Sequence, residues 1–294
     1  MDKIGIIGLG NMGMGIAKNV IKDGYQAVGY DLRKTRLKEL VSHGGEAAKS
    51  VDQVGQFCDV VFVMVMNGNQ VKEVVTELSP SLKERGTIII TATITPEEVK
   101  DAYKIAKKNN IKMVDSPVSG GLQGAHEGTL TLMTAADQKV FQDCKSILES
   151  ISKKMVYVGN NIGDGQTVKA ALQAFIGATF TAIFESLVLG AKAGIDGKIL
   201  YAVFSASGVS SPLLKNCAKL IMDRKFENTG SHISTMYKDL GISMDMAKKN
   251  GVPMFTASAA FELFQAGISM YPEGDSWSIV KLLETMADTK VEWY

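Results

Sequence analysis

The chain has 294 residues, of which 46% are hydrophobic and 21% charged, so it can bury a substantial core and disorder is not expected. Its 32 lysines and arginines nearly balance 31 aspartates and glutamates, and no basic run appears, which excludes the electrostatic signature of a nucleic-acid-binding protein. The 3 cysteines and 3 histidines show no metal-ligand spacing, so we expect neither a metal site nor a disulfide framework.

The N-terminal segment has no basic region and its apolar run is interrupted by glycines, so we expect no signal peptide. The most apolar long stretch, residues 172–189, contains Gln173 and Glu185 and has lysines on both flanks. A membrane span needs about 20 predominantly apolar residues. The sequence therefore predicts a cytoplasmic protein without a membrane segment.

The start of the chain alternates between strand and helix patterns. Residues 3–8 form a short apolar run ending in glycine, residues 13–23 carry apolar side chains at helical spacing before Gly24 as C-cap, and a second apolar run, 25–30, ends at Asp31. Strand, glycine turn, helix and strand in this order predict a βαβ unit.

The alternation continues for about half of the chain. Apolar runs predict strands at 59–66, 87–91 and 112–115, with a helix at 96–109 and shorter strands at 130–133 and 155–158. Strands that alternate with helices indicate a mostly parallel sheet covered on both faces. We therefore expect a Rossmann-type α/β domain at residues 1–162.

After Gly165 the pattern changes to helix throughout. Residues 167–194 contain no proline and read as one helix of about 28 residues, or about 42 Å. Helical periodicity follows in five further segments: 197–206, 211–223, 234–249, 253–267 and 276–287. The sequence predicts that a long interdomain helix opens an all-α domain at residues 163–294.

A glycine-rich turn, Gly8-x-Gly10-x-x-Gly13, links the first strand to the first helix. Such glycines allow a tight turn and a close backbone approach to a pyrophosphate, while the helix N-terminus supplies N–H donors. An ordinary glycine-rich turn is the alternative, but the position between a strand and a helix favours a dinucleotide site. We expect this site to comprise Gly8, Leu9, Gly10, Asn11, Met12 and Gly13.

Asp31 ends the second predicted strand, close to the spacing of about 20 residues expected for a ribose-binding acid. A carboxylate accepts hydrogen bonds from a 2′-hydroxyl and repels a 2′-phosphate, so NAD is favoured. Arg33 and Lys34 follow at once and could hold a 2′-phosphate, which leaves NADP possible. Capping of the next helix is the alternative role for Asp31.

The segment 115–121, DSPVSGG, follows a predicted strand directly. Ligands bind beyond the carboxyl ends of parallel strands in open α/β sheets. Ser119 and the N–H groups of Gly120 and Gly121 would form a small anion cradle suited to a carboxylate. A plain turn built from serine and glycine is the alternative.

Two lysines complete the candidate chemistry. Lys169 and Gln173 are four residues apart on the long helix and therefore share one face, where Lys169 is either a snorkelling surface residue or an amine that exchanges protons. Lys238 precedes Asp239 on a helix of the second domain, as either a solvated ion pair or a positive charge near the cofactor that would favour the neutral form of Lys169.

These motifs together resemble the β-hydroxyacid dehydrogenase family, relatives of 6-phosphogluconate dehydrogenase and 3-hydroxyisobutyrate dehydrogenase. The resemblance rests on four segments in the family's order: GLGNMGMGIAKNV, DSPVSGG, GDGQTVKAALQ and KDLG. It implies an active site in a cleft between the two domains, with Lys169 as the acid/base and Ser119, Gly120 and Gly121 as the substrate loop. It also implies cofactor contacts for Val65, Met66, Thr93 and Lys238.

The chain departs from the family's usual pattern at two places. Gln173 stands where the family usually has asparagine, and Val65-Met66 stands where it often has Leu-Pro. The Gln173 variant, with the GMGIA turn at residues 13–17 and the Gln70-Val-Lys stretch, resembles most the L-threonate dehydrogenase branch; a subfamily with another substrate is the alternative. In either branch Gln173 would contact the substrate hydroxyl with a different reach.

The sequence thus predicts NAD-dependent oxidation of a small hydroxy acid such as L-threonate. The alternatives are an NADPH-dependent semialdehyde or glyoxylate reductase, a 3-hydroxyisobutyrate dehydrogenase, an imine reductase, and a non-catalytic NAD-binding protein. The apolar long helix and the aromatic residues Trp277, Trp293 and Tyr294 favour a homodimer or homotetramer, although the same residues could simply pack in the core of the second domain.

Overall fold

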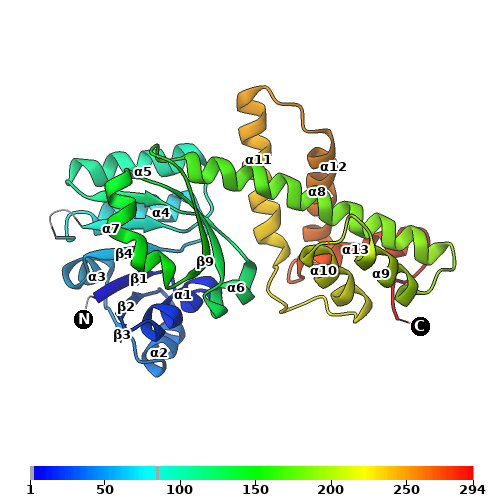
Figure 1. Ribbon diagram of the computed structural model, residues 1–294, viewed down its shortest axis with the longest axis horizontal. Helices are drawn as coiled ribbons and strands as arrows, with labels where there is room; N and C mark the ends of the chain where they lie inside the picture. Colours follow the sequence, from blue (N-terminus) through cyan, green and yellow to red (C-terminus); the bar gives the residue numbers. More distant parts are fainter. Residues whose placement is uncertain (1–2, 84–85, 294) are drawn as a thin grey trace. The chain divides into compact units, whose positions relative to one another are not determined.

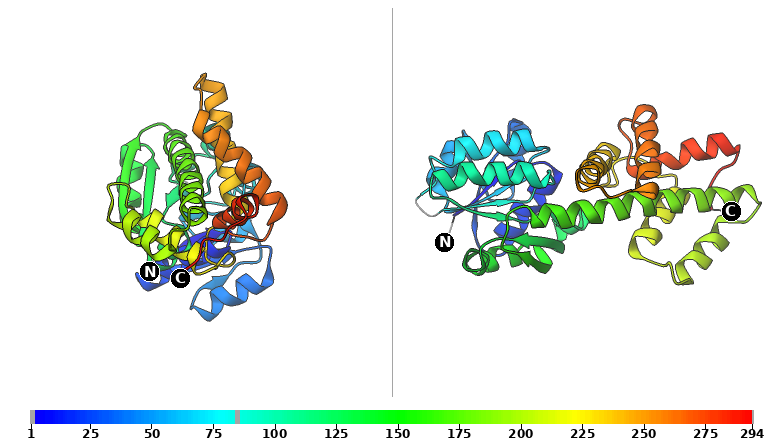
Figure 2. Two further views of the ribbon diagram at one scale, coloured as in Figure 1. Left: turned by 90° about the vertical axis from the view of Figure 1, so that its right-hand side faces the viewer. Right: turned by 90° about the horizontal axis from the view of Figure 1, so that it is seen from above.

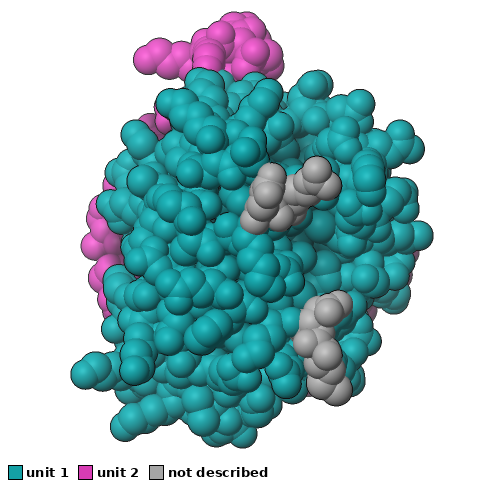
Figure 3. All heavy atoms as spheres, turned by 90° about the vertical axis from the view of Figure 1, so that its left-hand side faces the viewer, with its two compact units in different colours: residues 1–169 teal, residues 170–294 magenta. Residues whose placement is uncertain are grey.

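The computed structural model describes residues 3–83 and 86–293. The chain divides into two compact units, residues 1–169 and 170–294, which are coloured teal and magenta in Figure 3. The division falls inside the long helix, after Lys169. The domain limits 1–162 and 163–294 expected from the sequence stay a prediction.

Unit 1 is built on one mostly parallel sheet. The strand order is β3-β2-β1-β4-β5-β6-β8-β7, with β9 paired to β8. Strands β1 to β6 pair in parallel, whereas β8 is antiparallel to β6 and β7 and parallel to β9. The bounds are β1 Lys3–Ile7, β2 Gln26–Tyr30, β3 Glu46–Ala47, β4 Val60–Val63, β5 Thr87–Ile90, β6 Lys112–Asp115, β7 Val118–Ser119, β8 Leu130–Ala135 and β9 Ser152–Gly159. This sheet confirms the predicted Rossmann-type α/β class.

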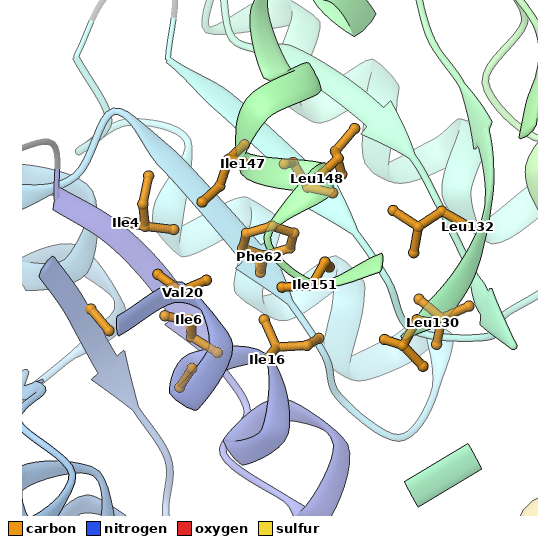
Figure 4. Packing of buried hydrophobic residues seen from close by; sticks show 14 of the residues in the cluster. Ile4, Ile6, Ile16, Val20, Phe62, Leu130, Leu132, Ile147, Leu148 and Ile151 are labelled. Carbon is orange, nitrogen blue, oxygen red and sulfur yellow. The ribbon is translucent and has the colours of Figure 1, made fainter. Parts of the chain in front are cut away.

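Helices cover both faces of the sheet (Figure 1). They are α1 Asn11–Lys22, α2 Lys34–Ser42, α3 Val51–Phe57, α4 Gly68–Leu78, α5 Pro96–Lys108, α6 Gly121–Glu127 and α7 Gln138–Glu149. Successive strand residues contribute to opposite faces: Phe62 packs in the cluster with α1 and α7, and Val61 and Val63 pack in the cluster with α3, α4 and α5. Figure 4 shows Phe62 among Ile4, Ile6 and Ile151 on the first of these faces.

The sequence pattern predicted one strand of unit 1 to be longer than the structure shows. The apolar run 59–66 predicted a single strand, but β4 ends at Val63 and the chain then turns into α4. The turn is set by Asn67, whose side chain accepts a hydrogen bond from the Gln70 N–H at 3.0 Å and so caps α4. A local cap therefore overrides the apolar periodicity, and Met66 is exposed.

The long helix α8 spans Asp164–Lys192 and is seen lengthwise as one continuous helix in the right-hand view of Figure 2. Length and composition alone would allow it to cross a membrane, but the core helices of soluble proteins meet the same criterion. Within the most apolar stretch of 18 residues in α8, 44% is buried inside the protein. Phe180, Phe184 and Leu187 belong to the hydrophobic core of unit 2, which identifies this part of α8 as a core helix.

The rest of unit 2 consists of helices α9 Gly197–Ala206, α10 Pro212–Met222, α11 Ile233–Asn250, α12 Phe255–Met270 and α13 Val280–Ala287, with a 3₁₀ turn at Ser276–Ile279. Trp277 is buried in the core, and its indole N–H donates to the Lys225 carbonyl at 2.8 Å. Trp293 is half-buried, and its ring forms a T-shaped contact with the ring of Tyr201. Trp277 is therefore a packing residue rather than a surface anchor, and Tyr294 lies outside the described residues.

Candidate functional site

The glycine-rich turn lies between β1 and α1, at the carboxyl end of β1, which pairs with β2 and β4. A Cβ atom added to Gly13 would lie 1.8 Å from the Gly8 carbonyl oxygen, so no side chain fits at this position. Gly10 occupies the N-cap of α1 and has no side chain to cover the first N–H groups of the helix. The turn therefore presents backbone N–H donors at a helix N-terminus, where Asn11 and Met12 of the predicted set begin α1. Leu9 is buried, and its N–H donates to Asp31 instead.

Asp31 follows β2 and faces this turn. Its Oδ2 accepts a hydrogen bond from the Leu9 N–H at 2.8 Å, and the Arg33 guanidinium contacts both carboxylate oxygens, at 3.0 and 3.1 Å. Burial raises the pKa of Asp31, but the hydrogen bonds from Arg33 and Leu9 outweigh it and hold the pKa below 3.8. The carboxylate is thus ionised at neutral pH, and it does not cap α2, whose N-cap is Arg33.

The other predicted cofactor positions of unit 1 also follow parallel strands. Val65 and Met66 lie in the short loop after β4, and the Met66 N–H donates to the Gln70 side chain at 2.9 Å. Thr93 follows β5 and is half-buried. Because parallel strands end at one edge of the sheet, these residues lie along the same edge as the glycine turn.

The predicted substrate loop lies at the antiparallel part of the sheet. Ser119 ends the short strand β7 and pairs with Thr131 of β8, while Gly120 is the N-cap of α6 and Gly121 its first residue. Ser119 is half-buried and both glycines are exposed. The anion cradle expected at these residues stays a prediction.

Lys169 lies in the second turn of α8 and is 6% exposed. The first turn of α8 is attached to the sheet edge by Asp115, which ends β6 and accepts a hydrogen bond from the Gly163 N–H at 2.9 Å. Gln166, one turn before Lys169, donates its amide to the same carboxylate at 3.0 Å. A lysine is therefore carried by a helix that begins at the edge where the glycine turn and the loop after β5 also lie.

Sequence reasoning missed the part played by Asp115 and Gln166. Both side chains are fully buried although both are polar. The available signal was the polar Gln166, which lies about one turn before Lys169 at a helix start that contains two glycines. It could not name the partner, because 51 residues separate the two side chains in the sequence.

Within unit 2 the structure brings three of the polar residues together. Gln173 donates its amide to Oδ2 of Asp239 at 2.6 Å, and both side chains are buried. Lys238 Nζ lies 2.9 Å from the other oxygen, Oδ1 of Asp239. Since a carboxylate can only accept, the NH₂ group of Gln173 faces Asp239 and its carbonyl oxygen faces away.

The residues present fit a dinucleotide at the edge of the sheet. A turn that excludes a Cβ, an uncovered helix N-terminus and an ionised carboxylate at the end of β2 are the groups that a pyrophosphate and a ribose require. Within residues 3–83 and 86–293, no group of three or more histidine, cysteine, aspartate and glutamate side chains could hold a metal ion.

Comparison with known families agrees with this geometry. Residues 3–159 match the family described as "NAD binding domain of 6-phosphogluconate dehydrogenase". Residues 163–283 match "NAD-binding of NADP-dependent 3-hydroxyisobutyrate dehydrogenase". The chain belongs to the β-hydroxyacid dehydrogenase family. It is an NAD(P)-dependent oxidoreductase that acts on hydroxy acids.

Individual relatives of this dehydrogenase are spread over several substrates. The chain is 31% identical to 2-(hydroxymethyl)glutarate dehydrogenase of Eubacterium barkeri, covering 98% of this chain and 97% of the relative. It is 33% identical to 2-hydroxy-3-oxopropionate reductase of Escherichia coli, covering 98% of this chain and 99% of that relative. It is 28% identical to L-threonate dehydrogenase of Pectobacterium atrosepticum, covering 95% of this chain and 93% of that relative.

Among solved structures, the 3-hydroxyisobutyrate dehydrogenase of Salmonella typhimurium has a TM-score of 0.88 at 27% identity, with 96% of this chain and all of that chain covered. Four different substrate names thus occur among proteins of comparable similarity. The family and the class of cofactor follow from these likenesses, and the individual substrate does not.

Asp115 gives a first prediction, on the pH dependence of stability. Burial raises the pKa of its carboxyl from 3.8 to about 6, against the lowering effect of the hydrogen bonds from Gly163 and Gln166. The unfolded chain releases this proton near pH ~4, so between pH ~4 and ~6 the folded state binds more protons and its stability falls as the pH rises.

Asp115→Asn removes this ionisation. In urea unfolding at a series of pH values, we expect the stability of the wild type relative to the variant to decrease from pH ~4 to ~6 and to stay constant at higher pH. A difference that does not vary with pH over this range would contradict the assignment.

Proposed function

We propose that the protein oxidises a small hydroxy acid with NAD, using Lys169 as the base that takes the hydroxyl proton. One observation carries the proposal: a buried lysine lies one turn beyond a helix start that is hydrogen-bonded to the strand-end edge bearing the dinucleotide turn. A buried amine in this place can exchange a proton with a hydroxyl held against it.

Each group at the site has a separate role in the proposed reaction. NAD held at this edge would supply the hydride acceptor for the carbon that carries the hydroxyl group. The chain binds its phosphates with the N–H groups that open α1 and its ribose with Asp31. Ser119 and the N–H groups of Gly120 and Gly121 hold the substrate carboxylate, and Lys169 receives the hydroxyl proton as the C–O bond gains double-bond character.

Gln173 supports a polyhydroxylated acid such as L-threonate as the substrate. Its NH₂ group is directed to Asp239, so the carbonyl oxygen is the end of the amide that remains to face a ligand. Gln173 and Lys169 share one face of α8 because they are four residues apart. A hydroxyl group that donates a hydrogen bond suits this acceptor.

The preference for NAD depends on Asp31, which is ionised and would repel a 2′-phosphate. Asp31→Ser removes that charge and frees the Arg33 guanidinium, which the carboxylate otherwise engages at both oxygens. A hydrogen bond to a charged group contributes about 1.5–3 kcal/mol, so we expect kcat/KM for NAD to fall roughly 10- to 100-fold while that for NADP rises.

Steady-state kinetics with both cofactors measures this change. Asp59→Ser is the matched control, because Asp59 is an exposed acid in a surface ion pair with Lys83. An unchanged ratio of the two kcat/KM values in Asp31→Ser, or a wild type that strongly prefers NADPH, would show that Asp31 does not select the cofactor.

Lys169→Ala removes the proposed base. General acid–base catalysis contributes about 10²- to 10⁴-fold, so we expect kcat to fall by that factor while NADH binding, followed by fluorescence, is nearly unchanged. Lys192→Ala is the control, since this exposed lysine ends the same helix and donates to the Asp288 carbonyl, at the far end of α8 from Lys169. Near wild-type turnover by Lys169→Ala would overturn the role.

The proposed reaction is tested by NADH formation from NAD with purified protein. The panel comprises L-threonate, D-glycerate, 3-hydroxyisobutyrate, 4-hydroxybutyrate, 6-phosphogluconate and 2-(hydroxymethyl)glutarate. Highest kcat/KM with L-threonate supports the assignment made from Gln173. A preference for another acid keeps the mechanism and rejects that substrate.

No turnover with any of the acids would direct the test to semialdehydes with NADH and NADPH. The E. coli relative named 2-hydroxy-3-oxopropionate reductase makes reduction the second candidate. Turnover in that direction alone would reject the proposed dehydrogenase and retain the family.

A further inference from the structure

The carboxylate of Asp115 is the buried polar group on which the start of α8 depends. Its side chain is fully buried at the end of β6. Oδ2 accepts from the Gly163 N–H at 2.9 Å and from the Gln166 N–H at 3.3 Å, and Oδ1 accepts from the Gln166 amide Nε2 at 3.0 Å. Both oxygens are therefore satisfied by the first residues of α8 and the residue before them.

Gln166 extends the same network to a second strand end. Its Nε2 also donates to the Ala92 carbonyl at 3.0 Å, and its Oε1 accepts from the Ile94 N–H at 3.1 Å. The two partners flank Thr93 in the loop after β5. One fully buried amide thus links that loop, the end of β6 and the helix that carries Lys169.

Close packing leaves α8 little freedom at this point. A Cβ atom at Gly165 would lie 2.6 Å from the Met133 carbonyl oxygen and 2.9 Å from that of Asp115. The backbone of the helix therefore lies directly on the backbone of β6 and β8. A shift of the helix start would break hydrogen bonds of Gln166 and Asp115 together.

Capping alone does not account for this arrangement. A helix N-terminus needs acceptors for its first N–H groups, and the Asp115 carboxylate supplies those. The Gln166 side chain serves another purpose, because its bonds to Ala92 and Ile94 join different elements and cap nothing. These bonds hold α8 in register with the loop after β5.

We propose that Asp115 and Gln166 form a clamp that positions Lys169 for the reaction, acting through the backbone of α8. Lys169 is three residues beyond Gln166, so the clamp and the amine are separated by less than one helical turn. The inference rests on the proposed function and extends it by two positioning residues. Misplacing a catalytic group by about 1 Å can cost roughly 10²-fold in rate.

Gln166→Met is the first test, because methionine has a similar length and none of the hydrogen bonds. We expect kcat to fall about 10- to 100-fold, while the Kd for NADH and the KM for the substrate change less than about 3-fold. The substrate is whichever hydroxy acid the wild type turns over.

Two controls separate positioning from general destabilisation. Gln142→Met makes the same change at an exposed position of α7, and Val75→Ala removes buried volume from α4, away from the clamp. We expect both controls to keep wild-type kcat below their unfolding temperatures. If Val75→Ala lost as much kcat as Gln166→Met at equal stability, the positioning role would be rejected.

A polarity exchange gives the sharper test. Asp115→Asn alone and Gln166→Glu alone each place like groups against one another, two amides or two carboxylates. In the double variant the new amide at position 115 could donate to the new carboxylate at position 166, while its oxygen still accepts from the helix N–H groups. A glutamate at position 166 has no donor for the Ala92 carbonyl, so the comparison that isolates the pair is with Gln166→Glu. We expect kcat of the double variant to exceed that of Gln166→Glu at least 5-fold, a factor that corresponds to about 1 kcal/mol of coupling between positions 115 and 166.

Hydrogen–deuterium exchange tests the clamp without any substrate. In Gln166→Met we expect faster exchange in peptides covering residues 92–94 and 163–169, and no change there in Gln142→Met. Unchanged exchange, wild-type kcat in folded Gln166→Met, or absence of rescue by the double variant would each overturn the proposal. A wild type without turnover on any hydroxy acid would instead reject the proposed function.

Discussion

The burial of one carboxylate is the constraint on which the junction between the sheet of unit 1 and the start of α8 depends. Asp115 is fully buried, and an ionised group in that position is tolerated only where hydrogen bonds replace the lost water. The donors come from the start of α8 and from Gln166. The end of β6 and the beginning of the long helix are therefore stable only as a pair, and the place of Lys169 follows from that pair.

The groups proposed to bind the cofactor follow strands that end at one edge of the sheet, where the helix that carries Lys169 also begins. The glycine turn after β1, Asp31 after β2, and Thr93 after β5 all follow parallel strands, whose carboxyl ends lie together. Gln166 is hydrogen-bonded on both sides of Thr93. The negative charge of the Asp31 carboxylate at this edge is balanced by the guanidinium of the neighbouring Arg33.

A second buried carboxylate, in unit 2, orients the proposed substrate contact. Asp239 orients the Gln173 amide so that its acceptor end is presented, which a sequence comparison of asparagine with glutamine does not reveal. Relatives at 28–33% identity carry different substrate names, as expected when discrimination among small hydroxy acids depends on a few contacts of about 1–3 kcal/mol each.

The sequence by itself determined the fold class, the dinucleotide turn and the helical character of the second half, because these depend on local periodicity and on glycines a few residues apart. It also marked Lys169 and Gln173 by their spacing on one helix. Only the tertiary structure decided where β4 ends and which partners Asp115, Gln166 and Asp239 have. The bonds of Asp115 to α8, of Gln166 to Ala92 and of Asp239 to Gln173 span 51 to 74 residues of the chain, and no short-range pattern encodes contacts over such separations.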